Sequence, residues 1–211
     1  MGRSTETKIN EVAIRLFLEK GYAQVTINDI CDACGITKPT FYKHAGCKEN
    51  LILDFYDRTI HDLLIDTYHF LEAGSHYEQL VLVFRTLIQI TKKYGQDLFS
   101  QMFISNLADD HHSFDMRDSL TKLCIVIIRN AQKAGEIGNK GDAEVLYRSI
   151  AYMFTGYECM WCIKKGELDW EEEFLESTEE LLQVREDMRI TKKPDGAKTA
   201  ASKDTKARKQ G

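Results

Sequence analysis

The chain has 211 residues, of which 43% are hydrophobic and 29% are charged, a balance typical of globular proteins. Its net charge of −5 is unevenly spread: residues 1–50 carry +1, residues 51–191 carry −11 and residues 192–211 carry +5. The acidic middle is poorly suited to polyanions, so any nucleic-acid contact must come from the first fifty residues or from the tail.

The N-terminal end is polar and lacks the apolar region of a signal peptide. No stretch approaches the roughly 18 apolar residues of a membrane span. We therefore expect a cytoplasmic protein with no membrane partner, whose six cysteines are thiols. Only two prolines occur, Pro39 and Pro194, which favours an all-α fold because the long stretch between them lacks a strong helix breaker.

Two helices are predicted first in the chain. The apolar residues of Thr5–Lys20 recur at helical spacing, and Gly21 stands where such a helix ends. Thr26 has the character of an N-cap with Asp29 three residues on, a variant of the capping box. This pair predicts a short second helix, Ile27–Cys34.

A turn and a third helix follow at once. Gly35 ends the second helix, Thr37 is a second N-cap, and Pro39 fits a first turn because its missing N–H costs nothing there. The third helix should run to about His44. Two short helices joined by a glycine turn make a helix-turn-helix, here at about residues 26–44.

The remaining chain is also predicted to be helical. The expected helices are Lys48–Ala73, 76–93, 96–107, 114–134, 142–165 and 170–188, which brings the total to about nine. The segment 192–211 has no apolar residue except alanine and should be a disordered basic tail.

The second helix of such a motif lies in the DNA major groove. Its polar side chains offer hydrogen-bond donors and groups suited to phosphate, with no acidic residue among them: Lys38, Thr40, Tyr42, Lys43 and His44. Phe41 is apolar and should face inward, fixing this helix onto the first one. The pattern is chemically coherent for contacts to both phosphates and base edges.

The stretch IRLFLEKGYAQVTINDICDACGITKPTFYKHAGCKENLI resembles the N-terminal domain of the TetR/AcrR family of bacterial transcriptional regulators. The residues in register are Phe17, Gly21, Tyr22, Thr26, Ile30, Gly35, Ile36, Thr37, Thr40, Phe41, Tyr42, His44, Lys48, Glu49 and Leu51. The resemblance covers about fifty residues. The rest of the chain matches in length and helicity.

This resemblance implies an interface with operator DNA. It assigns phosphate contacts to Thr26, Thr37, Tyr42, His44 and Lys48, and base contacts to Lys38, Thr40 and Lys43, with Pro39 in the same first turn. It also implies that residues 1–50 bind DNA and that residues 51–191 hold a small-molecule effector and form a homodimer. No cofactor is expected.

Two Cys-x-x-Cys pairs, Cys31/Cys34 and Cys159/Cys162, raise the alternative of a thiol- or zinc-dependent sensor. Their separation far exceeds the roughly 15–20 residues of a usual zinc site, so small buried filler is favoured and no metal is expected. Cys47, in a turn near helix N-termini, is the better candidate for a reactive thiol.

The polar segment around His111 and His112 is typical of a solvated loop. Ser113, Asp115 and His112 make no credible catalytic set, because nothing pairs a nucleophile with an oriented base. No glycine-rich phosphate loop is present either. An enzyme is not expected.

The middle helices are rich in aromatic residues and methionine. Each of these favours core packing, but as a set they also fit the lining of a cavity for an apolar or aromatic effector. The candidate lining residues are Phe55, Tyr68, Phe84, Phe99, Met102, Phe103, Tyr157 and Trp161.

The helix expected at 142–165 is apolar on more than one face, which requires a partner, and Gly156 allows close approach of another helix. A four-helix interface between two copies is predicted, with an inverted-repeat operator. The sequence thus indicates a ligand-responsive regulator and favours a repressor. A DNA-binding protein with an architectural or division-control role and no effector stays open as an alternative.

Overall fold

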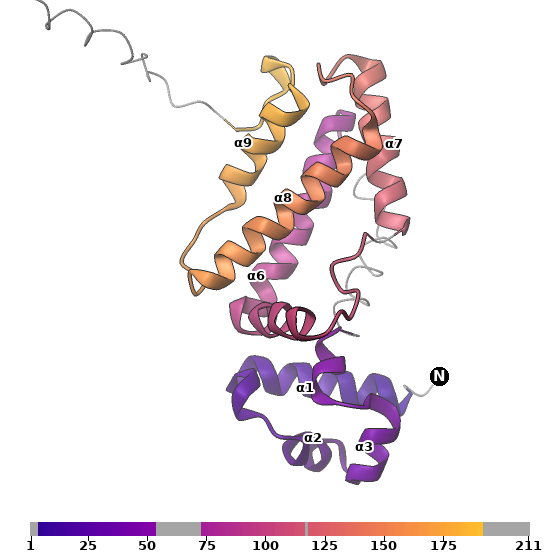
Figure 1. Cartoon of the computed structure of the whole chain (residues 1–211), viewed down its shortest axis with the longest axis vertical. Coiled ribbons are helices and arrows are strands. Elements are labelled where there is room, and N and C mark those ends of the chain that lie inside the picture. Colours follow the sequence, from indigo (N-terminus) through magenta and orange to yellow (C-terminus); the bar gives the residue numbers. More distant parts are fainter. Residues whose placement is uncertain (1–3, 54–72, 117, 192–211) are drawn as a thin grey trace, which may run out of the picture.

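The computed structural model describes residues 4–53, 73–116 and 118–191. Within these ranges the fold is all-α, as expected, and the extended pairing is limited to an isolated bridge between Ile137 and Val184. The elements are α1 (Thr5–Lys20), η1 (Tyr22–Gln24), α2 (Ile27–Cys34), α3 (Lys38–Ala45), α6 (His76–Ala108), α7 (Asp118–Ala134), α8 (Ala143–Ile163), α9 (Glu171–Leu182) and η2 (Glu186–Met188). Figure 1 shows α1–α3 as a lower layer beneath an upper bundle of α6–α9.

Predicted caps hold the N-terminal layer together. The Thr26 hydroxyl accepts a hydrogen bond from the Asp29 N–H at 3.2 Å, and the Asp29 carboxylate accepts one from the Thr26 N–H at 2.8 Å. This reciprocal pair is the expected capping box. Gly35 has a left-handed φ of 67°, which lets the chain turn into α3 without the cost of a Cβ. Phe41 then lies fully buried in the core of this layer.

A break at Gly95 divides α6 into two segments. Gly95 has φ 80° and ψ 158°, so the helical hydrogen-bond ladder cannot run through it. The two segments match the separate helices predicted at 76–93 and 96–107. The second segment lies across the base of the upper bundle, facing the N-terminal layer (Figure 1).

An aromatic cluster forms much of the core between α6, α8 and α9. The Phe174 ring lies 5.1 Å from Phe84, 5.4 Å from Phe154 and 6.1 Å from Trp170, measured between centroids. Tyr157 stacks on Trp170 at 6.0 Å. Tilted and edge-on pairs of this kind add to the free energy gained by burying apolar area.

The helix predicted at 170–188 is too long at its C-terminal end. In the structure α9 ends at Leu182, and a separate 3-10 turn occupies Glu186–Met188. Gln183 adopts a left-handed φ of 53°, and its carbonyl accepts from the Gly138 N–H at 2.8 Å. This tertiary pairing with a loop far away in the sequence overrides local helix propensity.

Several predictions fall outside the described residues. The helix expected at Lys48–Ala73 is helical over 48–53, and its remainder is not described. The candidate residues Phe55 and Tyr68 and the tail 192–211 also lie outside the described ranges. In the ranges that are described, no helix combines the length and apolarity needed to cross a bilayer.

Candidate DNA-binding face and effector cavity

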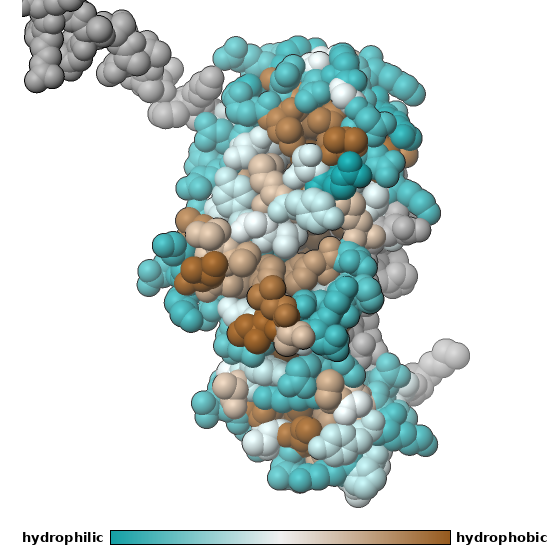
Figure 2. All heavy atoms as spheres, viewed as in Figure 1, coloured by the Kyte–Doolittle hydropathy of each residue, from teal (hydrophilic) through white to brown (hydrophobic). Residues whose placement is uncertain are grey.

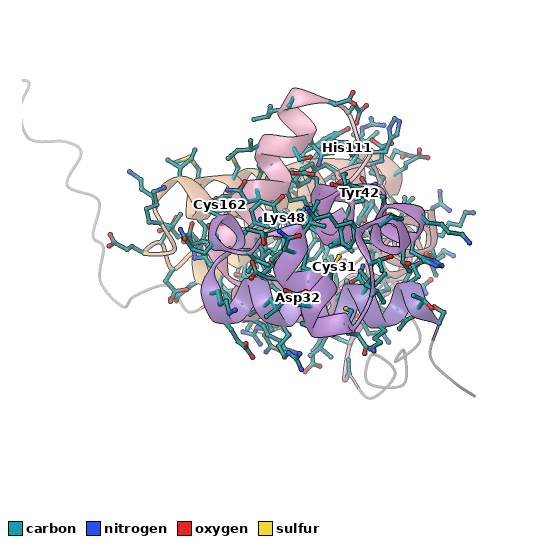
Figure 3. All side chains as sticks on the ribbon, turned by 90° about the horizontal axis from the view of Figure 1, so that it is seen from below. Cys31, Asp32, Tyr42, Lys48, His111 and Cys162 are labelled. Atoms are coloured by element: carbon teal, nitrogen blue, oxygen red, sulfur yellow. The ribbon has the colours of Figure 1, made fainter. Side chains whose placement is uncertain are left out.

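The N-terminal end of α3 presents a polar face to solvent. Lys38, Pro39, Tyr42 and Lys43 are exposed, and Thr40 and His44 are half-buried. The Tyr42 side chain is 52% exposed although it is aromatic, whereas its neighbour Phe41 is fully buried. Figure 3 views the N-terminal layer from below, with Tyr42 labelled. The arrangement leaves α3 free to enter a groove while Phe41 anchors it.

The two threonine N-caps flank this face. Thr26 and Thr37 are both exposed. The Thr26 hydroxyl also lies 2.6 Å from the Asp29 carboxylate, to which it donates, and the Thr37 and Thr40 hydroxyls lie 3.0 Å apart. Apart from Lys48, the residues expected to contact DNA are exposed or half-buried with no partner that turns them inward, and their roles on DNA stay predictions.

Lys48 is the member of the predicted set that points elsewhere. Its ammonium lies 3.8 Å from the centroid of the Tyr22 ring and donates a hydrogen bond to the Tyr22 carbonyl oxygen. Burial lowers the pKa of Lys48. A lysine held in this cation–π contact fixes the start of the next helix onto α1 and η1.

Tyr22 joins the two layers of the molecule. Its backbone N–H donates to the Asp97 carboxylate at 2.9 Å, and its hydroxyl donates to Glu49 at 3.0 Å. Asp97 lies two residues beyond the break at Gly95, so the second segment of α6 holds the N-terminal layer directly. Burial is the main cause that raises the pKa of the Tyr22 phenol, so it remains a donor at neutral pH.

A small cavity of about 70 Å³, partly open to solvent, lies between α6, α8 and the segment before α7. The residues that line it are Phe84, Leu87, Ser113, Phe114, Asp115, Met116, Leu120, Tyr147, Ala151, Tyr152, Phe154, Thr155 and Glu158.

Of the predicted lining residues, Phe84 lines this cavity. Phe103 lies behind its wall, stacked on Phe114 at 4.5 Å. Met102 borders a different hollow, next to Tyr22, and Phe99 is buried in the core.

The last two predicted lining residues belong to the packing around α8. The Tyr157 hydroxyl lies 3.1 Å from the Ser177 hydroxyl, and the Trp161 indole N–H donates to the Gly166 carbonyl at 3.1 Å. Helical spacing marks these positions as buried, but it does not say whether they face a core or a cavity.

Glu158 is a lining residue that the sequence interpretation missed. It is the single charged residue of the apolar run AYMFTGYECMWCI, and that isolation was the available signal. Its side chain is 1% exposed, and Thr91 of α6 lies 2.6 Å from its carboxyl oxygen. Burial raises the pKa of Glu158 to about 8, against the opposing effect of the Thr91 hydrogen bond.

The Thr91 hydroxyl also lies 3.1 Å from the Leu87 carbonyl, yet it has a single proton to give. If that proton goes to Leu87, the short contact with Glu158 requires a proton on the carboxyl group. A neutral Glu158 therefore completes a chain of donors and acceptors from α8 to α6.

This burial predicts a pH-dependent stability. The folded pKa of Glu158, about 8, lies above the ordinary 4.5, so the folded state keeps a proton that the unfolded state releases. The contribution is fully present below pH 4.5 and declines as pH rises to 8. Between pH 5 and pH 8 the free energy of unfolding of the parent should fall by about 2 kcal/mol or more relative to that of Glu158→Gln. Urea unfolding of both proteins at three pH values measures this, and parallel pH curves would contradict it.

The cysteine pairs lie in different layers, with Cys31 and Cys162 labelled in Figure 3. Cys31, Cys34 and Cys162 are buried and Cys159 is half-buried, largely as expected for small filler residues. Burial raises the pKa of the Cys162 thiol to about 11.

The other candidate reactive or metal-binding side chains lie apart from one another. Cys47 is half-buried, and His112 is exposed with its Nδ1 3.0 Å from Asp115. Across the described ranges, no three His, Cys, Asp or Glu side chains are grouped as metal ligands would be.

Comparison with known proteins agrees with this geometry. Residues 9–55 match the family model for bacterial regulatory proteins of the tetR family. The uncharacterized HTH-type transcriptional regulator YerO of Bacillus subtilis is 48% identical over 46 residues, which are 22% of this chain and 16% of YerO. YuxN, an uncharacterized regulator from the same organism, is matched over 32% of its length. The HTH-type transcriptional regulator TtgR of Pseudomonas putida is 22% identical over 167 residues, 72% of this chain and 76% of TtgR.

Solved structures show the same fold over most of the chain. Thermus thermophilus FadR, a TetR-family repressor crystallised with lauroyl-CoA, superimposes with a TM-score of 0.67 at 24% identity, covering 90% of this chain and 98% of that one. PfmR, a TetR-family regulator also from Thermus thermophilus, gives a TM-score of 0.58 at 21% identity, covering 84% and 98%. The N-terminal region thus matches the tetR-family model over residues 9–55, and the described chain shares its fold with solved TetR-family structures.

Proposed function

We propose that this regulator binds an inverted-repeat operator as a homodimer in the cytoplasm, and that a small apolar or aromatic molecule in the α6–α8 cavity releases it from DNA. The observation that carries the proposal is the combination of two sites in one chain. A polar face on α3 lies in the N-terminal layer, and a small, partly open cavity lies in the bundle above it. FadR, with the same fold, was crystallised with a small-molecule ligand.

A direct route connects the two sites. Phe84 and Leu87 of the first α6 segment line the cavity, and Asp97 of the second segment holds the Tyr22 backbone. A ligand that binds one arrangement of α6 better than another would shift the population of N-terminal layer orientations. The dimer would then leave the operator if, in the favoured orientation, the distance between its two recognition helices no longer matched the operator half-sites.

The test is binding of a fluorescent DNA fragment from upstream of the protein's own gene, compared with scrambled DNA at two salt concentrations. Specific binding that survives moderate salt supports the proposal, since non-specific contacts are mostly electrostatic. A ligand that raises the melting temperature and releases this DNA would exclude the architectural alternative. Weak binding that ignores sequence and disappears with salt would contradict operator recognition at this site.

An exposed apolar stripe on α8 supports the dimer. Val145 is 47% exposed, Tyr152 63%, Met160 44% and Ile163 61%, and Gly156 lies among them at helical spacing. Figure 2 shows apolar side chains gathered over the C-terminal end of α8. A protomer leaves such a stripe in water only at a cost, and two copies related by a two-fold axis would cover it mutually.

Gly156 provides a test that separates the dimer from the fold. A Cβ added there meets nothing within 4 Å in the protomer, and alanine in a helix interior is favoured over glycine by roughly 0.8–1 kcal/mol. Gly156→Arg should therefore leave the protomer folded but convert the dimer to a monomer in sedimentation equilibrium. Ala134→Arg, an exposed small residue at the end of α7, is the matched control and should stay dimeric. An intact Gly156→Arg dimer would show that this stripe is not the interface.

A further inference from the structure

We propose that the cavity selects ligands that carry a positive charge on an aromatic or apolar body, and that Glu158 is the group that pairs with this charge. The inference rests on the proposed function, because it names the chemical class of the effector for the same cavity. It starts from Glu158, a carboxyl group that lines the cavity from α8 while its side chain is 1% exposed.

Glu158 has unused hydrogen-bonding capacity. A carboxylate offers about four acceptor sites, and among the described residues Thr91 is the side chain bonded to it. A charge buried with so little compensation is costly unless a partner arrives. A ligand cation entering the cavity would supply that partner.

The rest of the cavity lining also favours a positively charged ligand. It contains a second carboxylate, Asp115, and no lysine, arginine or histidine among the described lining residues. Its walls include the rings of Phe84, Phe114 and Phe154. Aromatic faces attract cations, whereas among the described lining residues an anionic ligand would meet the carboxyl groups of Glu158 and Asp115. The net charge of −11 over residues 51–191 has the same sign.

Binding is coupled to proton release. In the empty cavity Glu158 is neutral, because burial holds its proton. When the cation enters, the Glu158 O–H bond breaks, the proton goes to solvent, and the carboxylate left behind pairs with the ligand and accepts a hydrogen bond from Thr91. Charge balances, since one positive charge enters the cavity and one leaves.

The other titratable groups on the elements around Glu158 are either neutral or paired with other side chains. On its own helix Cys162 and Tyr147 are neutral donors at neutral pH, because burial raises the pKa of each thiol or phenol, and Cys124 of α7 is neutral for the same reason. Asp115, in the segment before α7, is exposed and paired with His112. From α6, Thr91 faces the carboxyl group. The α6 cations Arg85 and Lys92 each lie 3.4 Å from the carboxylate of Glu171 of α9.

The experiment compares three ligands that share a naphthalene ring on the full-length protein by isothermal titration calorimetry at pH 6.5. They are trimethyl(1-naphthylmethyl)ammonium, the neutral 1-naphthylmethanol and the anionic 1-naphthoate. The ammonium ligand should bind at least about tenfold more tightly than the other two. Repeating the titration in two buffers of different ionisation enthalpy should show release of about one proton, which the fixed charge of the ligand assigns to the protein.

Glu158→Gln keeps the shape of the side chain and removes its charge. This variant should lose the preference for the ammonium ligand and the proton release, while Glu176→Gln, at an exposed position of α9 outside the cavity lining, should keep both. Binding of the alcohol or of naphthoate as tightly as the ammonium, a preference that survives in Glu158→Gln, or binding of none of the three would each overturn the inference.

Operator binding separates this inference from the proposed function. Ammonium binding that depends on Glu158 but leaves the DNA complex unchanged would support the cation site and contradict the effector role of the cavity. Release of DNA by the neutral or anionic ligand would support the effector role of the cavity and contradict the cation site. The two failures are therefore distinguishable in one set of titrations.

Discussion

Replacing Tyr42 and Lys43 together by alanine should weaken operator binding by about a hundredfold without unfolding the protein. Each recognition-helix contact to a base or phosphate contributes roughly 1–3 kcal/mol, and the two side chains are exposed on the same helix. Phe41, which anchors α3, is untouched and stays fully buried. Fluorescence anisotropy on the upstream fragment measures the affinity, and circular dichroism checks the fold.

The control is Lys133→Ala, which removes an exposed lysine near the end of α7, far from α3 in Figure 1. It changes net charge by the same amount as Lys43→Ala and should leave operator affinity nearly unchanged. If the double variant binds like the parent, or if Lys133→Ala weakens binding equally, α3 is not the DNA-reading surface.

Phe174→Ala should lower the free energy of unfolding by about 3–5 kcal/mol, the range for deleting a buried phenylalanine. Its ring is 0% exposed and lies within about 6 Å of four other rings, measured between centroids. Phe84 and Phe154, two of these neighbours, also line the cavity. The loss should therefore appear in urea unfolding and also as weaker binding of any ligand the cavity holds.

Phe174→Leu is the graded control, because it keeps most of the apolar volume and should cost less than half as much as alanine. Similar costs for both variants would mean that ring geometry rather than filled volume holds this core. A change below about 1 kcal/mol for alanine, well under the range for such a deletion, would contradict the packing described between α6, α8 and α9.

The local signals in the sequence were reliable because their causes are local. The capping pair Thr26 and Asp29 and the turn at Gly35 depend on residues a few positions apart, and the structure has each of them. Gly95 separated two predicted helices, and it is the residue with non-helical dihedral angles inside α6.

The cavity was largely out of reach because its boundary depends on tertiary packing. Helical spacing marks Phe154 and Tyr157 alike as apolar, yet Phe154 lines the cavity and Tyr157 stacks on Trp170. The left-handed Gln183 likewise depends on a loop more than forty residues away. Glu158 differs, because a single charged residue in an apolar helix is visible in the sequence. Its burial in the structure makes it a candidate ligand-binding group.

The joint at Tyr22 sets an energy scale for control. The bond from the Tyr22 N–H to the Asp97 carboxylate is of the charge-assisted kind, which contributes roughly 1.5–3 kcal/mol. A ligand present at about a hundred times its dissociation constant supplies about 2.7 kcal/mol. Because the two quantities are of equal size, remaking this bond lies within reach of ordinary concentrations of a moderately tight ligand. In the proposed release mechanism, this bond would hold one orientation of the N-terminal layer in the absence of ligand and could be broken when a ligand binds.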